Sequence, residues 1–182
     1  MEYKTDFSRS YRTRSKKSIH NNVFVEWNLI SYILKEHRFE YIEDITDRAL
    51  TLASHEADHI IRYICRQIKR NNRSALENVQ MLTGDMVTRV EYLLIPYDDQ
   101  YLDISESTCF DIDTLKTKIR YFFDEPMLPI TDEAFILILK ILHKRFDNMI
   151  SIAIKFCKAL KQTTITKRIM EDSADIVRLC LE

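Results

Sequence analysis

The hexapeptide ITDRAL at residues 45–50 returns as ITDEAF at residues 130–135, 85 positions further along the chain. Downstream of these copies, Leu-Thr at 82–83 matches Ile-Thr at 165–166, at an offset of 83. A sequence that repeats itself over this distance indicates two related structural units in one chain. The 182 residues therefore divide into a basic flexible tail (1–22), a first unit (23–96), a linker (97–110) and a second unit (111–182).

Each unit is predicted to form a short helix, a long helix and a second short helix, because its apolar residues recur with helical spacing. In the first unit the expected helices cover 26–38, Thr46 or Asp47 to about Asn72, and Thr83 to Pro96. In the second unit they cover 111–123, Thr131 to about Lys161, and Thr166 to the C-terminus. The second long helix is apolar on more than one face, which predicts a central position. The predicted fold class is all-α.

Glycine is nearly absent, since Gly84 is the only one in the chain. Glycine supplies positive φ angles at low cost, so its scarcity argues against glycine-rich phosphate loops, dinucleotide-binding folds and hairpin-rich β architectures. Six helices joined by capped loops should need almost no position with positive φ.

The composition also bears on the cellular compartment. No apolar run approaches the length of a membrane span, and the N-terminus lacks the apolar segment of a signal peptide. The four cysteines are far apart and form no CxxC pair, as expected of reduced thiols. We therefore expect an intracellular protein that is neither secreted nor inserted in a membrane.

The formal net charge of −1 hides an asymmetry along the chain. Residues 1–22 carry six Lys or Arg against two acidic residues, whereas the rest of the chain is mildly acidic. A basic arm fits a nucleic-acid-binding tail or a nuclear-import signal, and an ordinary solvated terminus is the alternative.

The pentapeptide HEADH at residues 55–59 matches HExxH, a zinc-protease signature in which two histidines one helical turn apart share a metal. Glu77 would be the nearest third ligand. The same place in the second unit reads KILHK, at residues 140–144, and His55 and His59 project away from the apolar stripe. We therefore favour surface histidines, and we expect no metal, no cofactor and no enzymatic activity.

The order of a short, a long and a short helix is the layout of the histone fold, and three segments strengthen the likeness. Residues 161–166, KQTTIT, resemble the second loop of core histones, Lys-Arg-x-Thr-Ile/Val-Thr. Residues 90–96, VEYLLIP, resemble the end of the third helix of histone 2B. Residues 45–50 resemble the entry into the long helix of the same histone. The resemblance covers about 23–96 and 111–182, and two fused units resemble the histone doublets of giant DNA viruses.

The resemblance implies that the two units pair in an intramolecular head-to-tail handshake, as a pseudo-heterodimer. It also implies that the chain binds and compacts double-stranded DNA in a nucleosome-like particle. The implied partner is a second histone doublet or another histone-fold protein, in the virion, the viral factory or the host nucleus. The alternative is a histone-fold scaffold subunit of a transcription or coactivator complex. Acidic residues at predicted helix starts, such as Asp47 and Asp132, would be harmless there but would repel phosphate.

Histone contacts with DNA are mainly contacts with phosphates, through helix N-termini and basic loop side chains. Basic residues of the tail, the loops and the second short helix are therefore the candidate phosphate ligands, and an ordinary solvated charge is the alternative for each. They are Arg9, Arg12, Arg14, Lys16, Lys17, Arg38, Arg48, Arg73, Lys116, Lys118, Lys161, Lys167 and Arg168. Thr164 and Thr166 are expected to be loop and cap residues.

Overall fold

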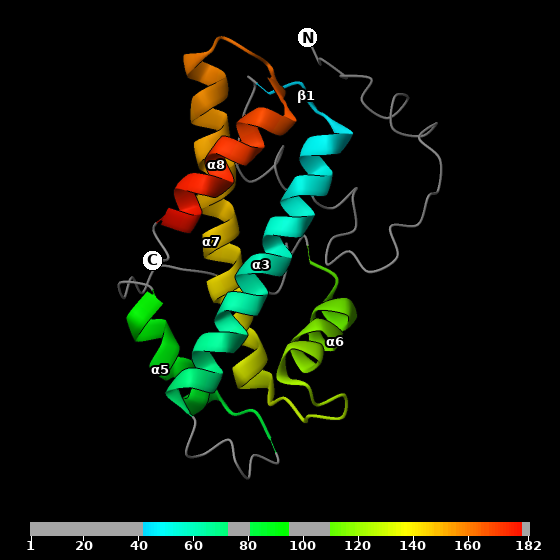
Figure 1. Cartoon of the computed structure of the whole chain (residues 1–182), viewed down its shortest axis with the longest axis vertical. Helices are drawn as coiled ribbons and strands as arrows, with labels where there is room; N and C mark the ends of the chain where they lie inside the picture. The colour runs from blue at the N-terminus through cyan, green and yellow to red at the C-terminus, as the bar shows by residue number, and fades with distance from the viewer. Residues whose placement is uncertain (1–41, 73–80, 95–109, 180–182) are drawn as a thin grey trace, which may run out of the picture.

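The computed structural model describes residues 42–72, 81–94 and 110–179 of the chain (Figure 1). In these residues it has five helices and two short strands: β1 (Asp44–Ile45), α3 (Asp47–Asn71), α5 (Gly84–Leu94), α6 (Ile112–Phe123), α7 (Asp132–Ala159), β2 (Thr164–Ile165) and α8 (Lys167–Leu179). The described part is mostly helical, which confirms the all-α prediction. The tail, the expected helix at 26–38 and residues 97–109 of the linker lie outside the described residues. No described helix has the length and apolar character needed to cross a membrane.

The repeated hexapeptide starts both long helices by the same device. Thr46 precedes α3, and its hydroxyl oxygen accepts a hydrogen bond of 3.3 Å from the backbone N–H of Ala49. Thr131 precedes α7 and accepts one of 3.2 Å from Ala134. Such caps satisfy N–H groups that have no partner within the first turn of a helix. Both helices therefore begin where the sequence predicted.

Positions with positive φ are few in the described residues, as predicted, and they lie at the ends of α6 and α7. Asp124 and Lys161 adopt left-handed backbone, at φ 60° and 54°. After α7, the N–H of Gln162 donates to Cys157 O at 2.9 Å and that of Lys161 donates to Lys158 O at 3.2 Å. This is the pairing of a Schellman motif, in which the left-handed residue is usually glycine. The chain therefore closes these helices with left-handed non-glycine residues.

Gly84 does not adopt the left-handed conformation, because its φ is not positive. It is the first residue of α5, and a Cβ atom at this position would meet only the end of the exposed Glu133 side chain in the first turn of α7, which can move aside.

The two long helices cross, and the short helices pack around them (Figure 1). α7 contacts α3, α5 and α8, which confirms its predicted central position. α6 and α8, from the second unit, lie on opposite sides of α3, from the first (Figure 1). Because each long helix packs against helices of the other unit, the buried core is shared between the units.

The loops beside the long helices pair crosswise. β1, which precedes α3, runs parallel to β2, which follows α7, with Ile45 opposite Ile165. Leu82, which precedes α5, forms a parallel bridge with Ile130, which precedes α7. In the sequence repeat, Ile45 corresponds to Ile130 and Leu82 corresponds to Ile165. The pair Ile45–Ile165 is therefore equivalent to the pair Ile130–Leu82, with the first and second units exchanged. The described part of the molecule therefore has approximate twofold symmetry.

Replacing the cap residue of α6 should cost about 1 kcal/mol of stability. Asp111 Oδ1 accepts a hydrogen bond of 2.7 Å from the N–H of Thr114. Hydrogen bonding to the Thr114 side chain, and then to its backbone N–H, holds the pKa of the Asp111 carboxyl below its ordinary value. A lowered pKa in the folded state means that the carboxylate stabilises the fold above the unfolded pKa. This contribution is lost as the pH falls through the folded pKa. Urea unfolding of Asp111→Ala and the wild type at neutral and acidic pH measures the difference.

Asp111→Asn is the control, since asparagine caps helices about as well but does not titrate. It should stay close to the wild type at neutral pH and show a weaker pH dependence. Equal stability of Asp111→Ala and the wild type at neutral pH would contradict a stabilising cap.

Candidate nucleic-acid interface

The pairing of β1 with β2 brings two helix N-termini to the same end of the molecule (Figure 1). The N–H of Thr46 donates to Ile165 O at 3.1 Å. From this point the segment after β1 enters α3, and the segment after β2 enters α8. Thr166 caps α8 as Thr46 caps α3, with a hydrogen bond of 3.4 Å from the N–H of Ile169. The N-terminus of a helix carries a partial positive charge and unpaired N–H groups. This end of the fold is therefore suited to bind an anion.

Basic side chains surround these two helix starts. Arg48 lies in the first turn of α3, and Lys167 and Arg168 lie in the first turn of α8. Lys161 lies in the loop before β2. All four side chains are exposed, and together we call them the basic end. More than a hundred residues separate Arg48 from the others, so only the fold brings these predicted ligands to one end of the molecule.

Three acidic residues, Glu43, Asp44 and Asp47, lie in or beside the loops of the basic end. Glu43 Oε2 accepts a hydrogen bond of 3.0 Å from the hydroxyl of Thr163, which joins the two paired loops. Asp44 Oδ1 accepts one of 2.8 Å from the N–H of Ile45. Asp47, in the first turn of α3, is exposed. These carboxylates weaken the positive potential of the basic end but leave its cationic side chains exposed.

The symmetry-related end of the molecule has the opposite charge. The repeat places Glu133 where the basic end has Arg48, and it places Gly84 and Asp85 where the basic end has Lys167 and Arg168. The exposed carboxylates of Asp85, Asp132 and Glu133 form what we call the acidic end. Among the described residues, one loop pair therefore carries exposed cations and the other exposed carboxylates.

The two predicted ligands on α6 have contacts within the protein. The ammonium group of Lys118 forms an ion pair with Asp58 of α3. Lys116 Nζ lies 4.9 Å from the ring centroid of Phe135. These contacts fix α6 against the long helices, so we do not include the two lysines in the interface. Of the other predicted ligands, Arg9, Arg12, Arg14, Lys16, Lys17, Arg38 and Arg73 lie outside the described residues.

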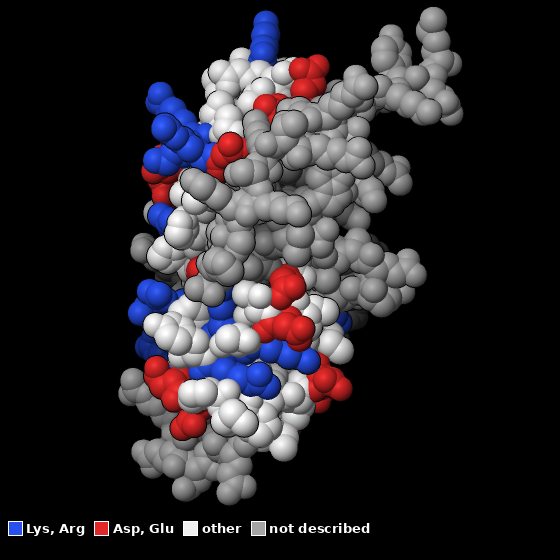
Figure 2. All heavy atoms as spheres, turned by 90° about the vertical axis from the view of Figure 1, so that its right-hand side faces the viewer, with Lys and Arg blue, Asp and Glu red and all other residues white. Residues whose placement is uncertain are grey.

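A row of arginines on the solvent face of α3 was missed from the sequence. Arg62, Arg66 and Arg70 are exposed and follow one another at intervals of four residues, so they lie on one side of the helix. No acidic residue follows Asp58 in α3. Figure 2 shows basic side chains gathered along its left-hand edge, which is the front of Figure 1. Regular basic spacing opposite the apolar stripe was the signal that could have identified this row.

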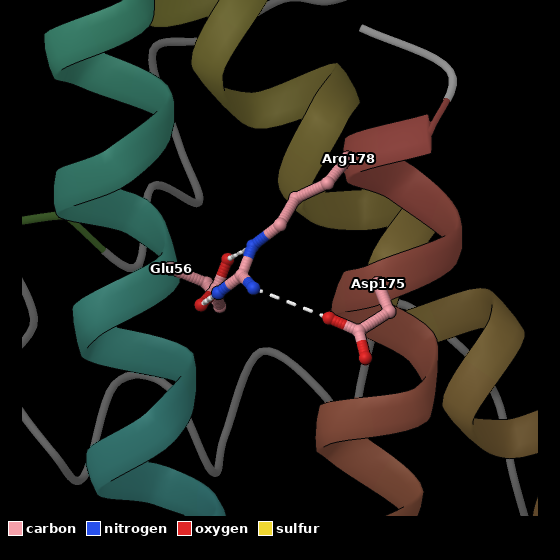
Figure 3. A network of polar contacts seen from close by, with 3 residues as sticks. All are labelled: Glu56, Asp175 and Arg178. Atoms are coloured by element: carbon pink, nitrogen blue, oxygen red, sulfur yellow. Dashed lines mark hydrogen bonds and ion pairs between the residues drawn. The ribbon is translucent and has the colours of Figure 1, made fainter. Parts of the chain in front are cut away.

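The HExxH segment has its glutamate turned away from solvent. His55 and His59 are exposed, whereas the side chain of Glu56 is 4% exposed and pairs with Arg178 of α8 (Figure 3). Arg178 Nε donates to one carboxylate oxygen at 3.0 Å and Nη2 donates to the other, while Nη1 donates to Asp175 Oδ1 at 3.1 Å. The bond to Glu56 raises the pKa of the Arg178 guanidinium. Both oxygens of Glu56 are therefore engaged in joining α3 to α8.

Metal ligands do not gather around this segment. In residues 42–72, 81–94 and 110–179, no three His, Cys, Asp or Glu side chains form a group that could hold a metal ion. Glu77, the proposed third ligand, lies outside these residues. Cys65 and Cys157 are free thiols in the core, and burial raises the pKa of Cys65 to about 12 and that of Cys157 above its ordinary value. Such thiols are poor nucleophiles and poor metal ligands.

Replacing Lys161 by glycine should change stability and DNA affinity in opposite directions. Lys161→Gly relieves the left-handed backbone and should raise the free energy of unfolding by about 0.5–1 kcal/mol. The same change removes a cation from the basic end, so the affinity for duplex DNA should fall. Urea unfolding and fluorescence anisotropy with labelled DNA measure the two effects.

Lys161→Asn is the matched control, because asparagine also tolerates left-handed backbone. It should lose DNA affinity as Lys161→Gly does. Lower stability of the glycine variant would refute the backbone argument. Unchanged DNA affinity in both variants would remove Lys161 from the interface.

The chemistry available at the basic end is the binding of anions. Guanidinium and ammonium groups beside two helix N-termini can contact several phosphate oxygens at once. Comparisons of the chain with protein-family models, curated proteins and solved structures gave no match in any of the three.

Proposed function

We propose that this chain is a histone doublet, in which two histone folds pair head-to-tail and bind and compact duplex DNA together with a partner doublet. The exchanged loop pairing carries the proposal: Ile45 pairs with Ile165, and Leu82 pairs with Ile130. Each long helix also packs against helices of the other unit, so an isolated unit would leave apolar surface exposed. Fusion into one chain makes this pairing intramolecular, at a high effective concentration.

The basic end supports the DNA-binding part of the proposal. Arg48, Lys167 and Arg168 stand beside the N-termini of α3 and α8, where a phosphate group would meet cationic side chains and backbone N–H groups. The acidic end cannot contribute in the same way. The DNA path would therefore need a partner beyond the basic end, and the basic tail at residues 1–22 adds further positive charge. Packaging of this kind would take place in the virion, the viral factory or the host nucleus.

DNA binding over a series of salt concentrations tests this function. Because affinity for phosphate comes from released counterions, we expect binding to duplex DNA at low salt and a steep loss of affinity as salt rises. Reconstitution with candidate partner histones, followed by nuclease digestion, should leave a protected DNA fragment. If the protein binds no DNA at low salt, alone or with a partner, the packaging function is refuted.

The second candidate function is a histone-fold scaffold in a transcription or coactivator complex. The acidic end favours it, because Asp85, Asp132 and Glu133 would repel phosphate but can accept a basic protein surface. A scaffold would retain its protein partners in a complex while showing little affinity for DNA at low salt. The salt series therefore distinguishes the two functions.

A further inference from the structure

A groove of about 420 Å³ lies on the surface between α3, α7 and α8. Its floor consists of four buried apolar side chains, Ile60, Met149, Ala174 and Val177. His59, Arg62 and Arg66 line it from the exposed side of α3. The groove thus combines an apolar floor with a basic rim.

The carboxylate that lines this groove is already neutralised. Glu56 accepts two hydrogen bonds from Arg178, whose remaining donor group is directed to Asp175 (Figure 3). Arg178 thus joins α8 to α3 through Glu56, and each of its three nitrogens donates one hydrogen bond to a carboxylate. The exposed guanidinium groups of Arg62 and Arg66 remain to meet a ligand.

Arg62 and Arg66 are well placed to act as a pair. They stand one helical turn apart on α3, so their Cβ atoms are about 6 Å from each other. The guanidinium of Arg62 lies 5.3 Å from the ring centroid of Phe122 in α6, which limits its freedom. Two such groups match carboxylates one or a few residues apart in a peptide.

This groove is separate from the basic end and has a different chemical character. His59 follows the first residue of α3 by 12 positions, which corresponds to about 18 Å along the helix. Duplex DNA presents phosphates to a basic surface and gains little from an apolar floor. An apolar floor beside cations instead favours a peptide that has both acidic and apolar side chains.

We propose that this groove binds an acidic segment of a partner protein, with carboxylates on Arg62 and Arg66 and an apolar side chain on the floor. The proposal does not depend on DNA binding. It gives the protein a second interaction surface, specific for a peptide, on the solvent face of α3.

Fluorescence anisotropy tests the proposal with the full-length protein and a labelled peptide made of three Asp-Glu-Leu-Glu repeats. We expect saturable binding at low salt, weakened at least about tenfold in Arg62→Gln/Arg66→Gln by the loss of two charge-assisted contacts. Peptides with Asn-Gln-Leu-Gln or Asp-Glu-Ser-Glu repeats should bind more weakly, because one lacks the charge and the other lacks the apolar side chain. Arg66→Gln alone should weaken binding by a smaller factor, and its unfolding midpoint should match that of the wild type.

Lys167→Glu/Arg168→Glu provides the reciprocal control, since it should bind the peptide as the wild type does. The proposal is overturned if the wild type does not bind the acidic peptide, or if the arginine variants bind it equally well. It is also overturned if Arg62→Gln/Arg66→Gln loses as much DNA affinity as Lys167→Glu/Arg168→Glu, because the groove would then belong to a DNA surface. If Lys167→Glu/Arg168→Glu loses DNA affinity and Arg62→Gln/Arg66→Gln does not, the result supports a groove that is separate from the DNA surface.

Discussion

Reversing two charges at the basic end, with Lys167→Glu/Arg168→Glu, is expected to lower the affinity for duplex DNA at least about tenfold. Both residues lie in the first turn of α8, beside Arg48 and the N-terminus of α3. If both contact phosphates, the slope of log affinity against log salt should fall by about 2, since each contact contributes about 0.9. Anisotropy titrations over a range of salt concentrations measure the affinity and the slope together.

Arg66→Glu/Arg70→Glu makes the same change in net charge near the C-terminal end of α3. Its DNA affinity should change by less than about threefold, because screening at moderate salt weakens charges more than about 10 Å away. Equal losses in the two variants would show that net charge, and not the paired loops, governs binding.

Replacing Arg178 by methionine is expected to lower the free energy of unfolding by about 3 kcal/mol. The Glu56 side chain is 4% exposed, and Arg178 supplies hydrogen bonds to both of its oxygens. Methionine keeps much of the aliphatic packing but leaves the carboxylate buried without a cation. Urea unfolding at neutral pH measures the deficit, which should shrink in acid because the isolated carboxylate can take up a proton.

The double variant Glu56→Gln/Arg178→Met should recover much of that loss, because no charge is then buried. Arg66→Met, at an exposed position on α3, is the matched single control and should change stability by less than about 0.5 kcal/mol. Near-wild-type stability of Arg178→Met would show that solvent reaches Glu56 and satisfies its carboxylate.

The groove and the Glu56–Arg178 pair are structurally linked. Arg178 lines the groove while it joins α8 to α3. A variant that breaks this pair should therefore also weaken binding of the acidic peptide, whereas Arg62→Gln/Arg66→Gln should affect the peptide with little effect on stability. Variants of the Glu56–Arg178 pair therefore test how peptide affinity depends on the shape of the groove, and Arg62→Gln/Arg66→Gln tests how it depends on charge.

Local features of the fold could be predicted because they depend on residues close together in the chain. The helical spacing of apolar residues gave the helical class, and the threonine of each repeated hexapeptide caps the following long helix. The end of α3 lies within one residue of the prediction and that of α7 within two. The individual left-handed residues, Asp124 and Lys161, were not predicted, because the backbone hydrogen bonds that close a helix end can hold a non-glycine residue in this conformation.

The sequence by itself determined the duplication, the helical class, the caps and the types of charge available at each loop. The tertiary structure decided which loops meet, so that Arg48 shares one end with Lys167 and Arg168, while the matching end carries Asp85 and Glu133. It also decided that Glu56, part of an apparent metal motif, pairs with Arg178, 122 residues away. The physical reason is that capping and periodicity act over one or two helical turns, whereas electrostatics and burial depend on distances in space that only chain packing fixes.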